Sequence, residues 1–83
     1  LVVHRAAMHL EDVVDDTVRA ARLLGDTRGV RVALTEVVEA PVQGDADLLG
    51  RLLLNLLDNA IKHSTTGHLV TVAMQRVGSA VQV

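Results

Sequence analysis

The sequence contains no cysteine, phenylalanine, tyrosine or tryptophan. Without cysteine, a disulfide framework and thiolate metal sites are excluded. Without aromatic rings, the stacking platforms typical of single-stranded nucleic-acid binding are missing. The net charge of −2 argues against a general nucleic-acid surface, so we expect no nucleic-acid partner. No apolar run reaches the roughly 18 residues of a membrane span, and no signal-peptide pattern opens the chain.

The composition is that of a small globular unit. The chain has 83 residues, and 49% of them are apolar. The core must therefore be built from aliphatic side chains, and a chain of this length is marginally stable without a partner or more chain. Because the sequence starts at Leu1 and stops at Val83 within an apolar stretch, we expect both ends to be cuts through a longer protein.

The first half of the chain predicts a short extended segment, a helix and a strand. Residues 1–10 are expected to be extended. Apolar residues recur at a spacing of three to four from Glu11 onward, which predicts an amphipathic helix that stops at Gly25. The run Val30–Val38 is rich in Val, Leu and Thr and predicts a half-buried strand, and Pro41–Gln43 is predicted to be a turn or an edge segment.

The second half predicts a longer helix and two strands. Asp45 is a good N-cap, and the helix is expected to run to about His63. Residues 64–67 form a polar loop, Leu69–Arg76 predicts a strand, and Gly78-Ser79 predicts a turn into a last strand, Ala80–Val83. The fold class is therefore α+β, as a two-layer α/β sandwich with helices on one face of a mostly antiparallel sheet.

The second helix carries the candidate site. A helix turns by about 100° per residue, so Asn55, Asn59, Lys62 and His63 share one stripe about 100° wide. A carboxamide oxygen can complete a Mg²⁺ shell that is otherwise made of water and phosphate oxygens, and a lysine supplies a positive charge for phosphate. The alternative is that both asparagines are surface residues bonded to neighbouring loops.

The rest of this helix is rich in leucine. We expect the main buried face to consist of Leu53, Leu56, Leu57 and Ala60, which point away from the polar stripe. Leu48 and Leu52 lie on the stripe itself, one to two turns before Asn55.

Residues 44–64 resemble the N box of bacterial sensor histidine kinases, most clearly in the run NLLDNAIKHS at residues 55–64. The N box belongs to the ATP-binding domain of these kinases, which has the Bergerat fold. The helix before it and the strands after it also fit that domain. The resemblance implies that residues 1–83 form a partial Bergerat ATP-binding fold, cut before the first glycine box and without a dimerisation or phosphoacceptor domain.

The resemblance also implies roles for single residues. Asn59 matches the asparagine that coordinates Mg²⁺, and Asn55 matches its partner one turn earlier, which lines the nucleotide pocket and is a second candidate ligand. Lys62 and His63 match positions near the phosphates and the ribose. Asp58 is expected to face solvent without a catalytic role, and Arg51 is as readily a structural ion-pairing residue.

The implied activity belongs to a longer parent protein. That parent would bind ATP and Mg²⁺, phosphorylate a histidine on a separate domain, act as a homodimer and pass the phosphoryl group to a response regulator. It would be anchored in the cell membrane with this domain on the cytoplasmic side. The glycine boxes, the lid and the phosphoacceptor motif are absent from the sequence, so we expect no catalytic residue in this chain and no autokinase activity from it alone.

Two other functions remain open. The chain could belong to a serine-kinase anti-sigma factor of the same superfamily, or it could be a non-catalytic interaction or oligomerisation module. A metal site on the histidines is disfavoured, because His4 and His9 are five residues apart, as are His63 and His68, and no cysteine assists. The acidic residues from Glu11 to Asp16 are explained by the dipole at a helix start.

Overall fold

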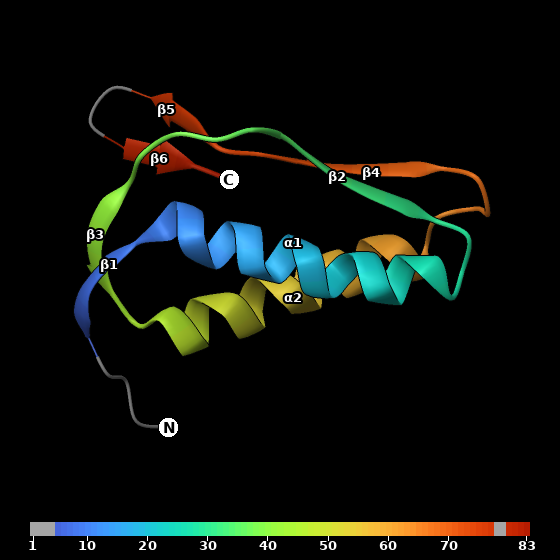
Figure 1. The fold of residues 1–83 in the computed structure, drawn as a ribbon, viewed down its shortest axis with the longest axis horizontal. Helices are drawn as coiled ribbons and strands as arrows, with labels where there is room; N and C mark the ends of the chain where they lie inside the picture. Colours follow the sequence, from blue (N-terminus) through green and yellow to red (C-terminus); the bar gives the residue numbers. More distant parts are fainter. Residues whose placement is uncertain (1–4, 78–79) are drawn as a thin grey trace.

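The computed structural model describes residues 5–77 and 80–83. The order of its elements is β-α-β-β-α-β-β-β, drawn in Figure 1: β1 (Ala6–His9), α1 (Leu10–Asp26), β2 (Arg31–Glu36), β3 (Pro41–Gly44), α2 (Ala46–Lys62), β4 (Leu69–Ala73), β5 (Gln75–Val77) and β6 (Ala80–Gln82). The predictions for residues 1–4 and for the turn at Gly78-Ser79 lie outside the described residues.

Helix α1 follows the predicted apolar pattern and begins one residue before Glu11. Its buried positions are Val14, Thr17, Val18, Ala21 and Gly25. The hydroxyl of Thr17 donates to the carbonyl of Val13 at 2.7 Å, so this buried polar group is satisfied within the helix. The chain then turns through Gly29, whose φ of 67° favours glycine.

Helix α2 begins where the sequence predicts. The side chain of Asp45 accepts a hydrogen bond from the backbone N–H of Leu48 at 3.0 Å, which confirms the predicted N-cap. The helix ends at Lys62, and His63 is its C-cap. The two helices lie side by side and run in the same direction on one side of the strands (Figure 1).

The strands form three two-stranded pairs. β1 pairs with β3 and β5 with β6, both antiparallel, whereas β2 pairs with β4 in parallel, with Arg31 opposite Leu69. The parallel pair lies over the helices (Figure 1), and the crossover between its strands contains α2. The two-layer α+β architecture is thus confirmed. Two of the three pairs are antiparallel as expected, but the pair that covers the helices is the parallel one.

The predicted strands differ in extent from the observed ones, and the strand expected over Val30–Val38 is the shorter β2. The segment Leu69–Arg76 is divided at Met74. The backbone N–H of Met74 donates to the carbonyl of Glu36 at 2.9 Å, and its side chain is fully buried. Of the two alternatives for Pro41–Gln43, the edge segment is confirmed and the turn is not: these residues belong to β3, which among the described strands pairs only with β1, and proline is tolerated there because its missing N–H need not pair.

The hydrophobic core lies between the helices and the parallel strand pair and is aliphatic throughout. Its buried members are Val14, Val18, Ala21, Val30, Val32, Ala40, Leu57, Ile61, Val72 and Met74. Within the described residues, neither helix is long and apolar enough to cross a lipid bilayer.

Candidate functional site

The four predicted site residues all lie on the exposed side of α2 or at its C-terminal end. Asn55, Asn59, Lys62 and His63 are each exposed. The buried side of the same helix is represented by Leu57 and Ile61, which are 6% and 1% exposed. The helix therefore has two distinct faces, and the polar stripe (Asn55, Asn59, Lys62 and His63) is on the face directed away from the core.

Neither asparagine side chain forms a hydrogen bond with another described part of the molecule. Within residues 5–77 and 80–83, no side-chain hydrogen bond is made by Asn55 or Asn59, so the alternative of amides bonded to neighbouring loops is not what these residues show. Asparagine is also a mediocre helix former, so each has a small intrinsic cost in the helix. Two adjacent carboxamides are thus open to solvent and to ligands.

Two leucines accompany the asparagines on this face. Leu52 is 53% exposed and Leu56 is 66% exposed. The prediction that Leu56 belongs to the buried face is therefore wrong. The buried arc is centred on Leu57 and Ile61, and Leu56 lies about 100° away from Leu57 around the helix axis, on the exposed side. The polar stripe is consequently bordered by apolar surface.

Lys62 forms an ion pair within the helix. Its Nζ lies 2.9 Å from Oδ2 of Asp58, one turn earlier. The side chain of Asp58 is 32% exposed and that of Lys62 is 51% exposed, so the pair is partly shielded. Asp58 is therefore half-buried and engaged with the lysine, which differs from the expectation that it simply faces solvent.

The donor set of the polar stripe fits magnesium better than a softer metal. Carboxamide oxygens are hard neutral ligands, and Mg²⁺ in nucleotide sites takes only one or two protein oxygens beside phosphate and water. Within the described part of the chain, no group of three or more His, Cys, Asp or Glu side chains could hold a metal by itself. A metal at this face would thus be held by Asn59, with Asn55 as the second candidate, together with oxygens from a bound phosphate.

Similar proteins were found among curated sequences but no protein-family model matches the chain. The sensor histidine kinase CusS of Escherichia coli O6:H1 is 34% identical over all 83 residues, and that of E. coli K12 is 32% identical over the same length. The non-motile and phage-resistance protein of Caulobacter vibrioides is 36% identical over 66 residues.

Solved structures agree with these relatives. The cytoplasmic segment of histidine kinase QseC matches 86% of the chain with a TM-score of 0.80 and 30% identity. The chain is homologous to a segment of sensor histidine kinases. The histidine kinase AdeS of Acinetobacter baumannii has the same fold, with a TM-score of 0.71 over 94% of the chain and 24% identity. The chain spans 17% of CusS and 48% of the QseC structure, so it corresponds to one part of such a kinase.

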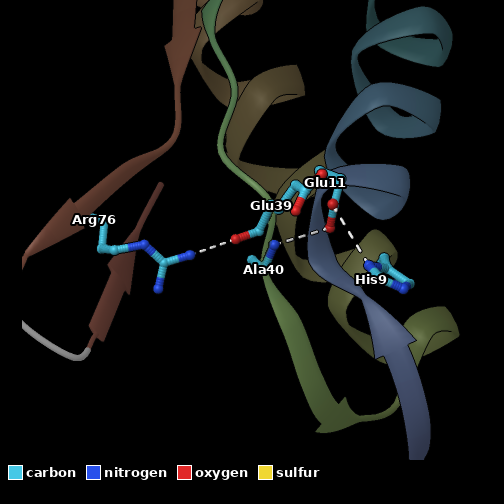
Figure 2. A network of polar contacts seen from close by, with 5 residues as sticks. All are labelled: His9, Glu11, Glu39, Ala40 and Arg76. Atoms are coloured by element: carbon cyan, nitrogen blue, oxygen red, sulfur yellow. Dashed lines mark hydrogen bonds and ion pairs between the residues drawn. The ribbon is translucent and has the colours of Figure 1, made fainter.

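A polar network joins the start of helix α1 to the connection between β2 and β3, and no sequence pattern predicts it. Oε1 of Glu11 accepts a hydrogen bond from the N–H of Ala40 at 3.1 Å, and Nδ1 of His9 lies 3.5 Å from Oε2 of Glu11 (Figure 2). The N–H of Leu10 donates in return to the carbonyl of Ala40 at 2.9 Å. From the other side, the guanidinium of Arg76 donates to the carbonyl of Glu39 (Figure 2).

The network lowers the pKa of Glu11. Partial burial acts to raise the pKa of this carboxyl, but hydrogen bonds from the N–H groups of Glu11 and Ala40, together with the charge of His9, outweigh it, so the pKa is lowered. Glu11 was predicted only to compensate the helix dipole. It also joins α1 to the connection between β2 and β3, a contact between residues 29 positions apart.

A hollow lies between the N-terminal halves of the two helices. It has a volume of about 500 Å³, and its lining includes Thr17, Gly50, Arg51 and Leu54. Arg51 makes no ion pair with any described residue, so the structural ion pair considered for it is not found. The hollow is separate from the polar stripe, because Gly50 and Leu54 face α1 whereas Asn55 and Asn59 do not.

Proposed function

We propose that the polar stripe of α2 binds ATP through its phosphates, with Mg²⁺, as part of a sensor histidine kinase. The observation that carries the proposal is the pair of carboxamides on Asn55 and Asn59. They lie one turn apart, they are exposed, and they make no side-chain hydrogen bond within the described residues. Homology to a segment of sensor histidine kinases supports the proposal, as does the preference of Mg²⁺ for hard oxygen ligands such as carboxamides and phosphates.

Each residue of the polar stripe has a distinct proposed role. The carboxamide oxygen of Asn59 would coordinate Mg²⁺, and that of Asn55 would be a further ligand or would bind a metal-bound water. When bound, Mg²⁺ neutralises part of the phosphate charge. The ammonium of Lys62 would bind a phosphate oxygen as a point charge, and the imidazole of His63, at the end of the helix, would contact the phosphate or the ribose.

The parent kinase would use this site for phosphoryl transfer. The γ-phosphoryl group of ATP would pass to a histidine nitrogen on a separate domain, ADP would leave, and the phosphoryl group would then move to an aspartate of a response regulator. The stripe contributes positioning and charge stabilisation, which account for most of the catalysis in this class of reaction. We place this activity in a dimeric kinase on the cytoplasmic side of the membrane, and expect none from the 83-residue chain alone.

The proposal is tested by calorimetric titration of the chain with ATP and Mg²⁺. Intrinsic fluorescence cannot be used, because there is no Trp or Tyr. We expect Mg²⁺-dependent binding that Asn59→Ala weakens by at least about tenfold, since one hydrogen bond or ligand to a charged group contributes roughly 1.5–3 kcal/mol. Gln43→Ala is the matched control, because it removes an exposed carboxamide from β3 instead.

Circular dichroism of each variant would show that the helices remain. Binding that does not depend on Mg²⁺, or that Asn59→Ala and Gln43→Ala affect equally, would refute the proposed site. Absence of binding by a folded chain would refute the proposal for this chain.

A further inference from the structure

The ion pair between Asp58 and Lys62 lies within the proposed phosphate site. Lys62 is the only lysine of the chain, and its Nζ is 2.9 Å from Oδ2 of Asp58. The proposed function assigns this ammonium to a phosphate oxygen. The ammonium of Lys62 thus has two candidate partners, the carboxylate of Asp58 in the same helix and the phosphate of a ligand.

Helix geometry places these partners on opposite sides of the lysine. Around the helix axis, Lys62 lies between Asp58 and Asn59, about 40° from the first and 60° from the second. The ion pair therefore draws the ammonium toward Asp58 and away from the carboxamides of Asn55 and Asn59. A phosphate held at the carboxamides must attract Lys62 back across the helix surface.

Electrostatic considerations indicate that Asp58 and a bound phosphate compete for the ammonium of Lys62. An exposed or partly exposed ion pair between residues four apart in a helix is weak, so a multiply charged phosphate can displace it. The carboxylate of Asp58 would in addition repel that phosphate at short range. Both effects of Asp58 oppose phosphate binding, and its partial shielding from solvent limits how far water screens them.

We propose that Asp58 is a positioning residue that holds Lys62 in a phosphate-free resting state and thereby lowers the affinity of the site for phosphates. This inference rests on the proposed function and adds to it a residue that sets the affinity. Asp58 would act through Lys62, not by contact with the nucleotide. Its removal should therefore strengthen binding, an outcome that damage to the fold does not produce.

The test compares two aspartate substitutions in the full 83-residue chain. Asp58→Asn removes the ion pair of α2, and Asp15→Asn removes a matched pair of α1, in which Nη2 of Arg19 lies 2.9 Å from Oδ2 of Asp15, also four residues apart. Both substitutions change the net charge equally. Calorimetric titrations would use ATP with Mg²⁺ and, separately, inorganic tripolyphosphate with Mg²⁺, so that binding through phosphates alone is recognised.

We expect Asp58→Asn to bind both phosphate probes about threefold to tenfold more tightly, and Asp15→Asn to remain within about twofold of the unsubstituted chain. In a Lys62→Gln background, the gain from Asp58→Asn should fall to about twofold or less, because only the direct repulsion is then relieved. The side-chain NMR signals of the single lysine should also shift in Asp58→Asn before any phosphate is added.

The outcomes separate the two proposals. If the unsubstituted chain binds and Asp58→Asn binds equally or more weakly, the inference is overturned and the proposed function stands. An undiminished gain in the Lys62→Gln background would overturn the action through Lys62. If neither the chain nor Asp58→Asn binds either probe, the proposed function fails and the inference fails with it.

Discussion

The two helices have the same length but divide their residues differently between core and surface. Each contains 17 residues, yet α1 has five buried positions and α2 has two, Leu57 and Ile61. Helix α1 exposes large apolar side chains only in its last turns, at Leu23 and Leu24, whereas α2 exposes Leu52 and Leu56 at its middle, beside the asparagines. We infer that α1 mainly supports the fold and that α2 supports the fold with one face and presents a binding surface with the other.

The largest expected effect separates the two faces of α2. Leu57→Ala should destabilise the chain by about 2–5 kcal/mol, because it opens a cavity beneath a residue that is 6% exposed. The adjacent Leu56→Ala should change the free energy of unfolding by no more than about 0.5 kcal/mol, because Leu56 is 66% exposed. Urea denaturation followed by circular dichroism measures both. Equal losses would show that the two faces are not distinct.

The next effect contrasts one glycine from each helix. A Cβ added at Gly25 of α1 would lie 2.3 Å from the carbonyl oxygen of Val30, so Gly25→Ala should cost about 1–3 kcal/mol as the chain shifts. A Cβ at Gly50 of α2 would have its nearest neighbours at 3.8 Å, an ordinary contact. Gly50→Ala should therefore stabilise the chain by about 0.5–1 kcal/mol. Thermal unfolding of both variants would show opposite shifts, and shifts of the same sign would contradict the contrast.

The smallest effect concerns how the two helices begin. Helix α2 is capped locally by Asp45, whereas α1 is fastened to Ala40 through Glu11. Because the pKa of Glu11 is lowered in the folded chain, its contribution is complete above the ordinary glutamate pKa of about 4.3 and is lost as the pH falls through the lower folded value. Unfolding of the chain should thus depend on pH more steeply between about pH 5 and pH 3 than unfolding of Glu11→Gln.

The control for this pH effect is Asp12→Asn, which removes an acidic residue from the same first turn of α1. Its pH dependence should resemble that of the unsubstituted chain. If Glu11→Gln and the unsubstituted chain lose stability in parallel on acidification, the link between Glu11 and Ala40 does not stabilise the fold.

Local sequence patterns were sufficient to predict most of the fold. The apolar spacing of α1 and the N-cap at Asp45 are local signals, and the structure confirms both. Two features depend on contacts between residues that are distant in the sequence, so no local pattern predicts them. They are the division of the segment Leu69–Arg76 at Met74 and the hydrogen bond between Glu11 and Ala40. The fold class followed from the order of elements, whereas the parallel pairing of β2 and β4 follows from the crossover that α2 provides.

The candidate site was predictable as a set of residues but not in its surroundings. Helical periodicity was enough to place Asn55, Asn59, Lys62 and His63 together. It could not show that Leu56 is exposed, because the width of the buried arc depends on how α1 and β4 pack against α2. Nor could it show which of its neighbours Lys62 pairs with, since that choice depends on side-chain conformation.

The most direct test of the account is site-resolved NMR of the chain titrated with ATP and Mg²⁺. Asn55 and Asn59 are the only asparagines in the sequence, so their side-chain amide signals can be recognised by residue type. The account predicts that these signals shift in a Mg²⁺-dependent manner, together with the backbone signals of residues 55–63, while those of Asp15 and Arg19 on α1 remain unchanged. Shifts concentrated on α1, or no shift of either asparagine at saturating nucleotide, would contradict it.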